Sequence, residues 1–128
     1  MREITKIISV QVDGKALDFR LTKLDAFSGV SLLRIMSRLP EGGVSIEMLL
    51  TCLPEEELRS LMTVCLEHAE VLLPAGWIPV LTKGEWSFPE IAHDTAICLK
   101  LTLEEAVWTL EGFFGGGASG SLPEIPGS

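Results

Sequence analysis

Two runs within residues 4–22 alternate between apolar and polar side chains, and this period of two constrains the fold more than any other feature of the chain. One face of the first run carries Ile4, Ile8, Val10 and Val12, and one face of the second carries Leu17, Phe19 and Leu21. Side chains of a β-strand point alternately to opposite faces, so each run predicts a strand with one buried face. Asp13-Gly14 between the runs is a strong signal for a two-residue turn. Residues 4–22 are therefore predicted to form a β-hairpin.

The periodicity changes from strand to helix after the hairpin. Asp25 or Ser28 can cap the first turn, and the proline and glycines at 40–43 end the segment. Its apolar residues recur at helical spacing: Phe27, Val30, Leu33 and Met36, backed by Leu32 and Ile35. A helix is predicted to follow the hairpin directly.

Two further helices are predicted in the middle of the chain. Ser45 opens a short one at 46–52. Residues 54–57, Pro-Glu-Glu-Glu, start a longer one, because the helix dipole favours acidic side chains in the first turn. The apolar stripe of this longer helix consists of Leu58, Leu61, Met62, Cys65, Leu66 and Ala69. The region from Val71 to Trp86 follows neither period, and its prolines and glycines predict extended segments or an ordered loop.

The C-terminal part contains two capping boxes. Ser87 with Glu90 predicts a helix that runs to about Lys100. Thr102 with Glu105 predicts either a second helix or a restart of the first, ending at Gly112. The buried stripe of that last segment is Leu103, Ala106, Val107 and Leu110. The sequence thus predicts a mainly α-helical α+β domain at 1–114, with the hairpin packed on four or five helices, and a flexible Gly/Ser/Pro tail at 115–128.

Composition restricts the class of protein. The apolar fraction of 47% and the mean hydropathy of +0.36 lie at the upper edge for a soluble protein, which favours apolar surface reserved for partners. The longest apolar run, Val71 to Leu81, is too short to span a membrane, and the N-terminus lacks the pattern of a secretory signal. The three cysteines, each among apolar residues, are typical of reduced core cysteines: Cys52, Cys65 and Cys98. We therefore expect a cytosolic protein without a membrane interaction.

The charge argues against nucleic acid as a partner. The net charge is −8, whereas binding to phosphates depends on Lys and Arg. Residues 1–40 hold seven Lys or Arg and four Asp or Glu, and residues 41–128 hold three and fourteen. One explanation of this uneven charge distribution is that the charges lie on ordinary solvated faces. The other is that the distribution orients a partner, or a second copy of the chain in a homo-oligomer.

The motifs for chemistry are weak. Gly115, Gly117 and Gly120 spell G-x-G-x-x-G, but no helix follows to bind a dinucleotide. Four residues are potential metal ligands, and we interpret them as core cysteines and surface histidines: Cys65, His68, His93 and Cys98. The three acids at 55–57 are interpreted as an exposed first turn of a helix rather than a cation site. His93 and Cys98 are five residues apart on a predicted helix and point in different directions, so they do not form a catalytic pair. We predict no catalytic, cofactor or metal site, and hence no enzyme.

Large aromatic side chains are the remaining candidates for a functional role. Trp108 is predicted to lie in the core. For the other four, a position in the core and a position on a partner-binding surface agree equally well with the sequence: Trp77, Trp86, Phe113 and Phe114.

The order of these features resembles the tail assembly chaperones of long-tailed bacteriophages and prophages. The similarity covers about Ala16 to Phe114. It rests on the hairpin and helix "ALDFRLTKLDAFSGVSLLRIMSRL", on "LMTVCLEHAEVLL" before a loop with Trp and Pro, and on "GEWSFPEIAHDTAICLKLTLEEAVWTLEGFF" with its paired Phe. The resemblance implies a non-catalytic protein of the host cytoplasm, absent from the mature virion. It implies that the protein binds the tape measure protein, keeps it soluble and helps to recruit the tail tube protein. The working surface expected from it is a set of exposed apolar positions on helices.

The resemblance also suggests an interpretation of the C-terminal segment. In such phages a longer chaperone is commonly made by a programmed −1 ribosomal frameshift. Codons for Gly112, Phe113 and Phe114 can contain the slippery sequence U-UUU-UUC, so we hypothesise that the shift occurs there. A tail without any role is an equally good explanation of residues 115–128.

Two other classes of protein stay open at this point. One is a structural tail completion or head-tail joining protein, which would be retained in purified virions. The other is a small metal-dependent enzyme, which would contain stoichiometric zinc.

Overall fold

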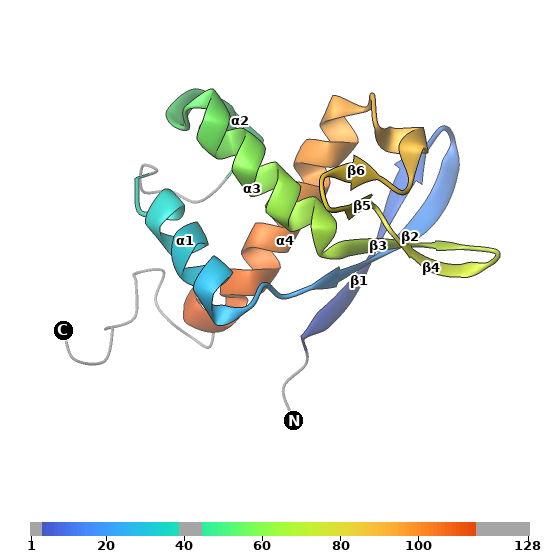
Figure 1. The fold of residues 1–128 in the computed structure, drawn as a ribbon, viewed down its shortest axis with the longest axis horizontal. Helices are drawn as coiled ribbons and strands as arrows, with labels where there is room; N and C mark the ends of the chain where they lie inside the picture. The colour runs from blue at the N-terminus through green and yellow to red at the C-terminus, as the bar shows by residue number, and fades with distance from the viewer. Residues whose placement is uncertain (1–3, 39–44, 115–128) are drawn as a thin grey trace.

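The chain forms an α+β fold in which a four-stranded antiparallel sheet packs against helices (Figure 1). The structure, a computed structural model, describes residues 4–38 and 45–114, with side chains up to Glu111. Within this part the sheet order is β1-β2-β3-β4, and a separate two-stranded ribbon, β5-β6, lies beside helix α3. The elements are β1 (Thr5–Val12), β2 (Lys15–Thr22), α1 (Ala26–Met36), α2 (Ile46–Cys52), α3 (Glu55–Glu67), β3 (Ala69–Leu73), β4 (Gly76–Pro79), β5 (Leu81–Thr82), β6 (Glu85–Trp86), the short 3₁₀ helix η1 (Pro89–Ile91) and α4 (Thr95–Phe114).

The predicted hairpin and the position of its turn are confirmed. Its two strands are joined at Val12 and Lys15, opposite each other. Asp13 and Gly14 adopt φ values of 51° and 80°, as a two-residue turn that matches the strand twist requires. Phe19 and Leu21 are fully buried, so the apolar face of the alternating pattern is the face that meets the helices.

The interpretation of Val71 to Trp86 as extended segments or a loop was too coarse, because this region completes the sheet. β3 pairs with β2, with Phe19 opposite Val71, and β4 pairs with β3. Ala69, assigned from the sequence to the stripe of the preceding helix, is instead the first residue of β3, since α3 ends at Glu67. Because apolar residues continue from α3 into β3, the sequence pattern does not show where the helix ends and the strand begins.

The three central helices begin where the sequence predicts. Of the two candidate caps of α1, Asp25 is the one used, since its carboxylate accepts a hydrogen bond from the Ser28 N–H at 3.3 Å. Ser45 caps α2 in the same way, accepting from the Met48 N–H at 3.2 Å. Residues 55–57 form the acidic first turn of α3.

The predicted helix starting at Ser87 is wrong. The Ser87 hydroxyl is hydrogen-bonded to Thr82 at 2.7 Å instead of closing a capping box, and only η1 forms there. α4 starts at Thr95, where the Asp94 carboxylate accepts from the Ile97 N–H at 3.1 Å. Asp94 thus caps α4, seven residues after the predicted cap at Ser87.

The second capping box does not interrupt α4 either. Thr102 donates its hydroxyl to the Cys98 carbonyl at 2.8 Å, one turn earlier, and Glu105 is fully buried. α4 therefore continues as one helix and ends at Phe114, two residues beyond the predicted end at Gly112. None of the helices in the described ranges is long and apolar enough to cross a membrane.

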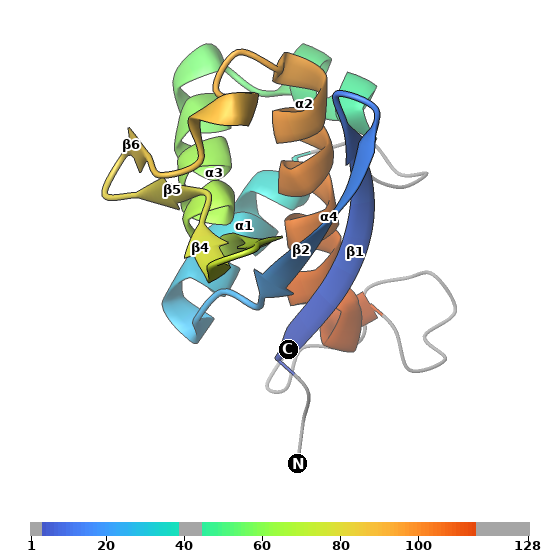
Figure 2. The same cartoon turned by 90° about the vertical axis from the view of Figure 1, so that its right-hand side faces the viewer.

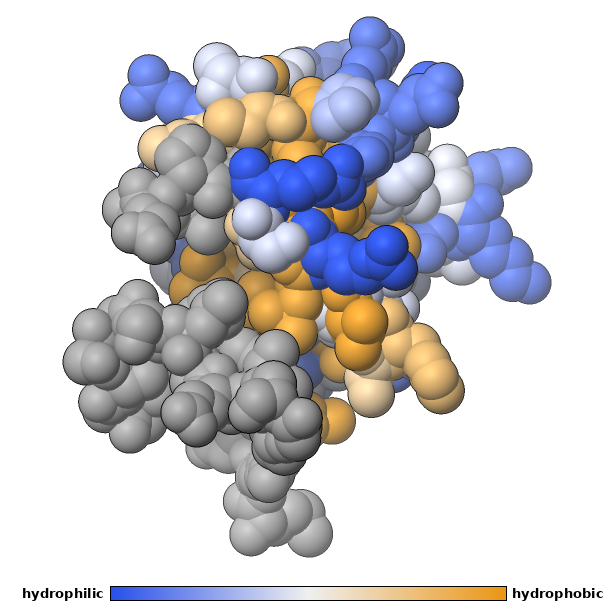
Figure 3. All heavy atoms as spheres, turned by 90° about the vertical axis from the view of Figure 1, so that its left-hand side faces the viewer, coloured by the Kyte–Doolittle hydropathy of each residue, from blue (hydrophilic) through white to orange (hydrophobic). Residues whose placement is uncertain are grey.

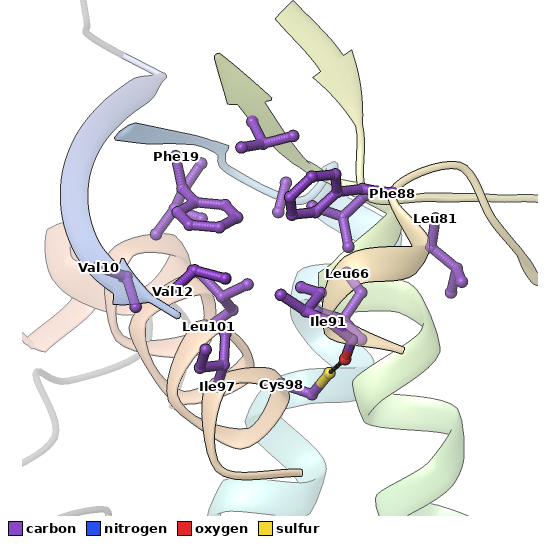
Figure 4. Close-up of a cluster of buried hydrophobic side chains, with 14 of the residues drawn as sticks. Val10, Val12, Phe19, Leu66, Leu81, Phe88, Ile91, Ile97, Cys98 and Leu101 are labelled. Carbon is purple, nitrogen blue, oxygen red and sulfur yellow. Dashed lines mark hydrogen bonds between the residues drawn. The ribbon is translucent and has the colours of Figure 1, made fainter. Parts of the chain in front are cut away.

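Helix α4 lies between the sheet and the other helices (Figure 2). Two clusters of buried side chains pack against it. The first cluster fills the space between the sheet and α4, where the rings of Phe19 and Phe88 meet edge to face with centroids 6.5 Å apart (Figure 4). The second cluster joins α4 to α1, α2 and α3 through Leu32, Leu49, Leu61, Cys65 and Ala106. Both clusters include residues of α4, so this helix connects the sheet to α1, α2 and α3.

Candidate partner-binding surface

Helix α1 carries apolar side chains on two sides, and only one of them is packed. Leu32 and Met36 are buried in the second cluster. Phe27 is 85% exposed and Val30, one turn later, is 55% exposed. Figure 3 shows the side of the molecule where α1 and α2 lie, with hydrophobic residues between and below the hydrophilic ones. We call Phe27 and Val30 the α1 surface.

The packed side of α1 is held by α4 at the start of the helix. The Leu24 N–H donates to the hydroxyl of Thr109 at 3.1 Å. Farther along, the guanidinium of Arg38 pairs with Glu57 of α3 at 2.6 Å. These contacts fix α1 on one side and leave the α1 surface exposed within the described part of the chain.

The sequence contained a signal for this surface. Seven of the eleven residues of α1 are apolar, and they occupy more than one face of the helix: Ala26, Phe27, Val30, Leu32, Leu33, Ile35 and Met36. A helix that packs on one side of a small domain buries a stripe rather than its full circumference. Periodicity alone did not tell which apolar side would be left exposed.

Trp86, one of the predicted partner-binding residues, lies on an open groove. The groove has a volume of about 390 Å³ and runs between α3, the β5-β6 ribbon and the start of α4. Its apolar lining includes Leu58, Met62, Leu66, Leu81 and Trp86. Trp86 is 39% exposed, so its ring is accessible beside this groove.

Trp77 lies apart from Trp86, on the face of the sheet that points away from α4. The guanidinium of Arg20 stacks over its ring, 4.4 Å from the centroid. Arg20 also forms an ion pair with Glu70 at 2.7 Å. The half-buried Trp77 is therefore engaged within the chain, in a cross-strand cluster.

Phe113 and Phe114 belong to the last turn of α4, but their side chains lie outside the described residues. The proposed partner contacts of these two residues, and the hypothesis of a frameshift at Gly112 to Phe114, stay predictions. The glycine motif at 115–120 and the tail at 115–128 also lie outside the described part. Trp108 is buried, as expected, and its indole N–H donates to the Ile4 carbonyl at 3.1 Å.

The cysteines and histidines do not converge on a site in the described ranges. Burial raises the pKa of Cys65 above its usual range, and it raises the pKa of Cys98, beside Asp94, to about 11. Cys98 donates its thiol to the Ile91 carbonyl at 3.2 Å (Figure 4), and His68 is hydrogen-bonded to the Val64 carbonyl at 2.8 Å. No group of three or more metal-binding side chains occurs in these ranges. Cys65 and Cys98 are core residues as predicted, whereas Cys52 is exposed because it lies on the solvent side of α2.

One buried acid has no counterpart in the sequence predictions. Glu105 is fully enclosed in the middle of α4, and burial raises the pKa of its carboxyl from 4.5 to about 9. The Thr109 hydroxyl donates to Oε2 at 3.3 Å, while Oε1 has no partner in the described residues. The carboxyl is therefore protonated at neutral pH. The sequence predicts Glu105 as part of a capping box at the start of a helix, and so its burial was not predicted.

Comparison of the chain with protein-family models, with curated proteins and with solved structures found no match.

Proposed function

We propose that this chain is a tail assembly chaperone of a long-tailed bacteriophage or prophage, acting in the host cytoplasm and absent from the mature virion. It binds the tape measure protein, keeps it soluble and helps to recruit tail tube subunits. The observation that carries the proposal is the exposure of Phe27 and Val30 on a helix whose opposite side is already packed. The choice of the tape measure protein as the partner rests on the resemblance of the sequence to that family.

The mechanism follows from apolar burial. A tape measure protein is a long helical polypeptide with apolar stripes that water does not solvate well. When such a stripe lies against the α1 surface, both partners lose exposed apolar area, at about 1.5–3 kcal/mol for each large side chain that becomes fully buried. The net charge of −8 on each bound chaperone keeps the loaded complex in solution.

The proposal is tested by co-expression with the tape measure protein of the same phage. We expect the double substitution Phe27→Ser and Val30→Ser to weaken binding by at least about tenfold, since about 1.4 kcal/mol corresponds to that factor. The soluble yield of the tape measure protein should fall accordingly. Val107→Ser is the matched control, because Val107 is also an exposed apolar residue on a helix but lies on α4.

Two results would overturn the proposal. One is unchanged binding of the tape measure protein by the double variant. The other is recovery of the chain in purified virions at a fixed copy number, which indicates a structural tail completion or head-tail joining protein instead.

A further inference from the structure

We propose that two copies of this chain associate through the free edges of their β1 strands, so that the two sheets join into one. Among residues 4–38 and 45–114, β1 is the first strand in the sheet order and pairs only with β2. The proposal concerns the opposite side of β1, here called the free edge. It does not depend on the α1 surface or on the identity of the partner protein.

The hydrogen bonds of the hairpin determine which residues face the free edge. In an antiparallel ladder, residues that bond to the neighbouring strand alternate with residues that do not. The Lys23 N–H donates to the Ile4 carbonyl at 2.8 Å, so the even-numbered residues of β1 direct their backbone groups toward β2. The odd-numbered residues direct theirs toward the free edge: Thr5, Ile7, Ser9 and Gln11.

The free edge is long and open in the described residues. β1 pairs with β2 over all eight of its residues without a bulge, and it contains no proline. Native proteins usually protect such edges with prolines, bulges or charges, because unpaired N–H and C=O groups bind other strands. Ile7, in the middle of the edge, is 57% exposed.

The charge pattern of β1 favours an identical strand as the occupant. Two copies of one strand carry the same charges, so outward-facing charged residues would repel each other. All four side chains that accompany the free edge are uncharged. The single charge of the strand, Lys6, lies on the helix side, with its ammonium group 5.7 Å from the centroid of the Trp108 ring.

One antiparallel register pairs all of the outward-facing residues. When Ile8 lies opposite Ile8 of the second copy, Thr5 faces Gln11 and Ile7 faces Ser9, each twice by symmetry. Every N–H and C=O group that points to the free edge then has a partner. Ile8 itself forms a non-hydrogen-bonded pair with its copy, for which Cα atoms lie about 4.5 Å apart.

The first experiment measures mass against concentration by sedimentation equilibrium. We expect the wild-type chain to approach twice its mass of 13.9 kDa at high concentration. Ile7→Lys places a charge at the edge and should raise the dimer dissociation constant at least about tenfold. Val30→Lys is the control, because Val30 is 55% exposed and receives the same new side chain away from β1.

The second experiment tests the register by disulfide formation under mild oxidation. Cys52→Ser removes the exposed native thiol. In this background Ile8→Cys should form an intermolecular disulfide, since the proposed spacing lies within the range that such bonds tolerate. Gln11→Cys should not form one, because the register separates the two Gln11 residues by several positions. Circular dichroism of each variant shows whether it is folded.

The proposal is overturned if the wild-type chain remains a monomer at every concentration. It is also overturned if Ile7→Lys and Val30→Lys weaken association equally, or if only Val30→Lys does, which assigns the contact to α1. Cross-linking through Gln11→Cys but not Ile8→Cys would exclude the register. None of these results depends on binding to the tape measure protein, so the two proposals fail separately.

Discussion

The hydroxyl of Thr109 joins α4 to the start of α1 by accepting a hydrogen bond from the backbone N–H of Leu24, at 3.1 Å. The same hydroxyl donates to the carboxyl of the buried Glu105, at 3.3 Å. The helix that carries the α1 surface is thus fixed by a side chain 85 positions away in the sequence. This link and the buried Glu105 lead to two predictions about stability, and the cross-strand cluster of Arg20, Trp77 and Glu70 leads to a third.

Thr109→Val should destabilise the fold. Valine has nearly the same shape as threonine, so packing is kept, but the Leu24 N–H loses its acceptor. An unsatisfied polar group in a partly buried position costs about 1–3 kcal/mol. Urea denaturation measures this loss, and Thr109→Ser, which retains the hydroxyl, should recover most of it. Equal stability of Thr109→Val and wild type would show that water replaces the acceptor.

Glu105 should make the free energy of unfolding decrease as pH rises. The folded carboxyl has a pKa of about 9 because of its burial, whereas the carboxyl of the unfolded chain has the ordinary value of 4.5. Between these two values the folded state holds a proton that the unfolded state has released. The stability from this group is therefore fully present below pH 4.5 and falls by about 1.4 kcal/mol per pH unit up to pH 9.

Glu105→Gln isolates this effect, because the amide fills the same space and does not titrate. Denaturation at pH 6, 7, 8 and 9 should show the variant gaining stability relative to wild type with each step. Thr109→Ser serves as a control in which the carboxyl is retained. Parallel pH profiles for Glu105→Gln and wild type would contradict the assignment of a neutral, buried acid.

Trp77 should contribute to stability through Arg20 rather than through a partner. In the cross-strand cluster the guanidinium contacts both the indole ring and the Glu70 carboxylate. A double-mutant cycle of Arg20→Ala and Trp77→Ala should give a coupling energy of about 0.5–1 kcal/mol, the magnitude for a partly exposed cation–π pair. The pair Arg20→Ala and Trp86→Ala is the control and should show no coupling, because Arg20 lies on β2 of the four-stranded sheet and Trp86 on the separate β5-β6 ribbon. A coupling energy near zero for the first pair would return Trp77 to the candidates for partner binding.

The features that the sequence predicts correctly depend on residues close to one another in the chain. The turn at Asp13-Gly14 and the caps at Asp25 and Ser45 were predicted because each depends on residues within three or four positions. The register of the hairpin is also fixed locally, since a two-residue turn leaves one way to pair the strands.

The sequence by itself therefore determined the hairpin, the starts of the central helices and the large apolar content. Only the tertiary structure decided that residues 69–79 extend the sheet, because strand pairing with β2 depends on residues about 50 positions away. It also decided that α4 is one helix, with Glu105 buried in its middle rather than capping a new segment. Finally, it decided which apolar side of α1 faces α4 and which leaves Phe27 exposed. The physical reason is that burial depends on the neighbours that folding brings together, and a periodic pattern specifies a face but not what lies against it.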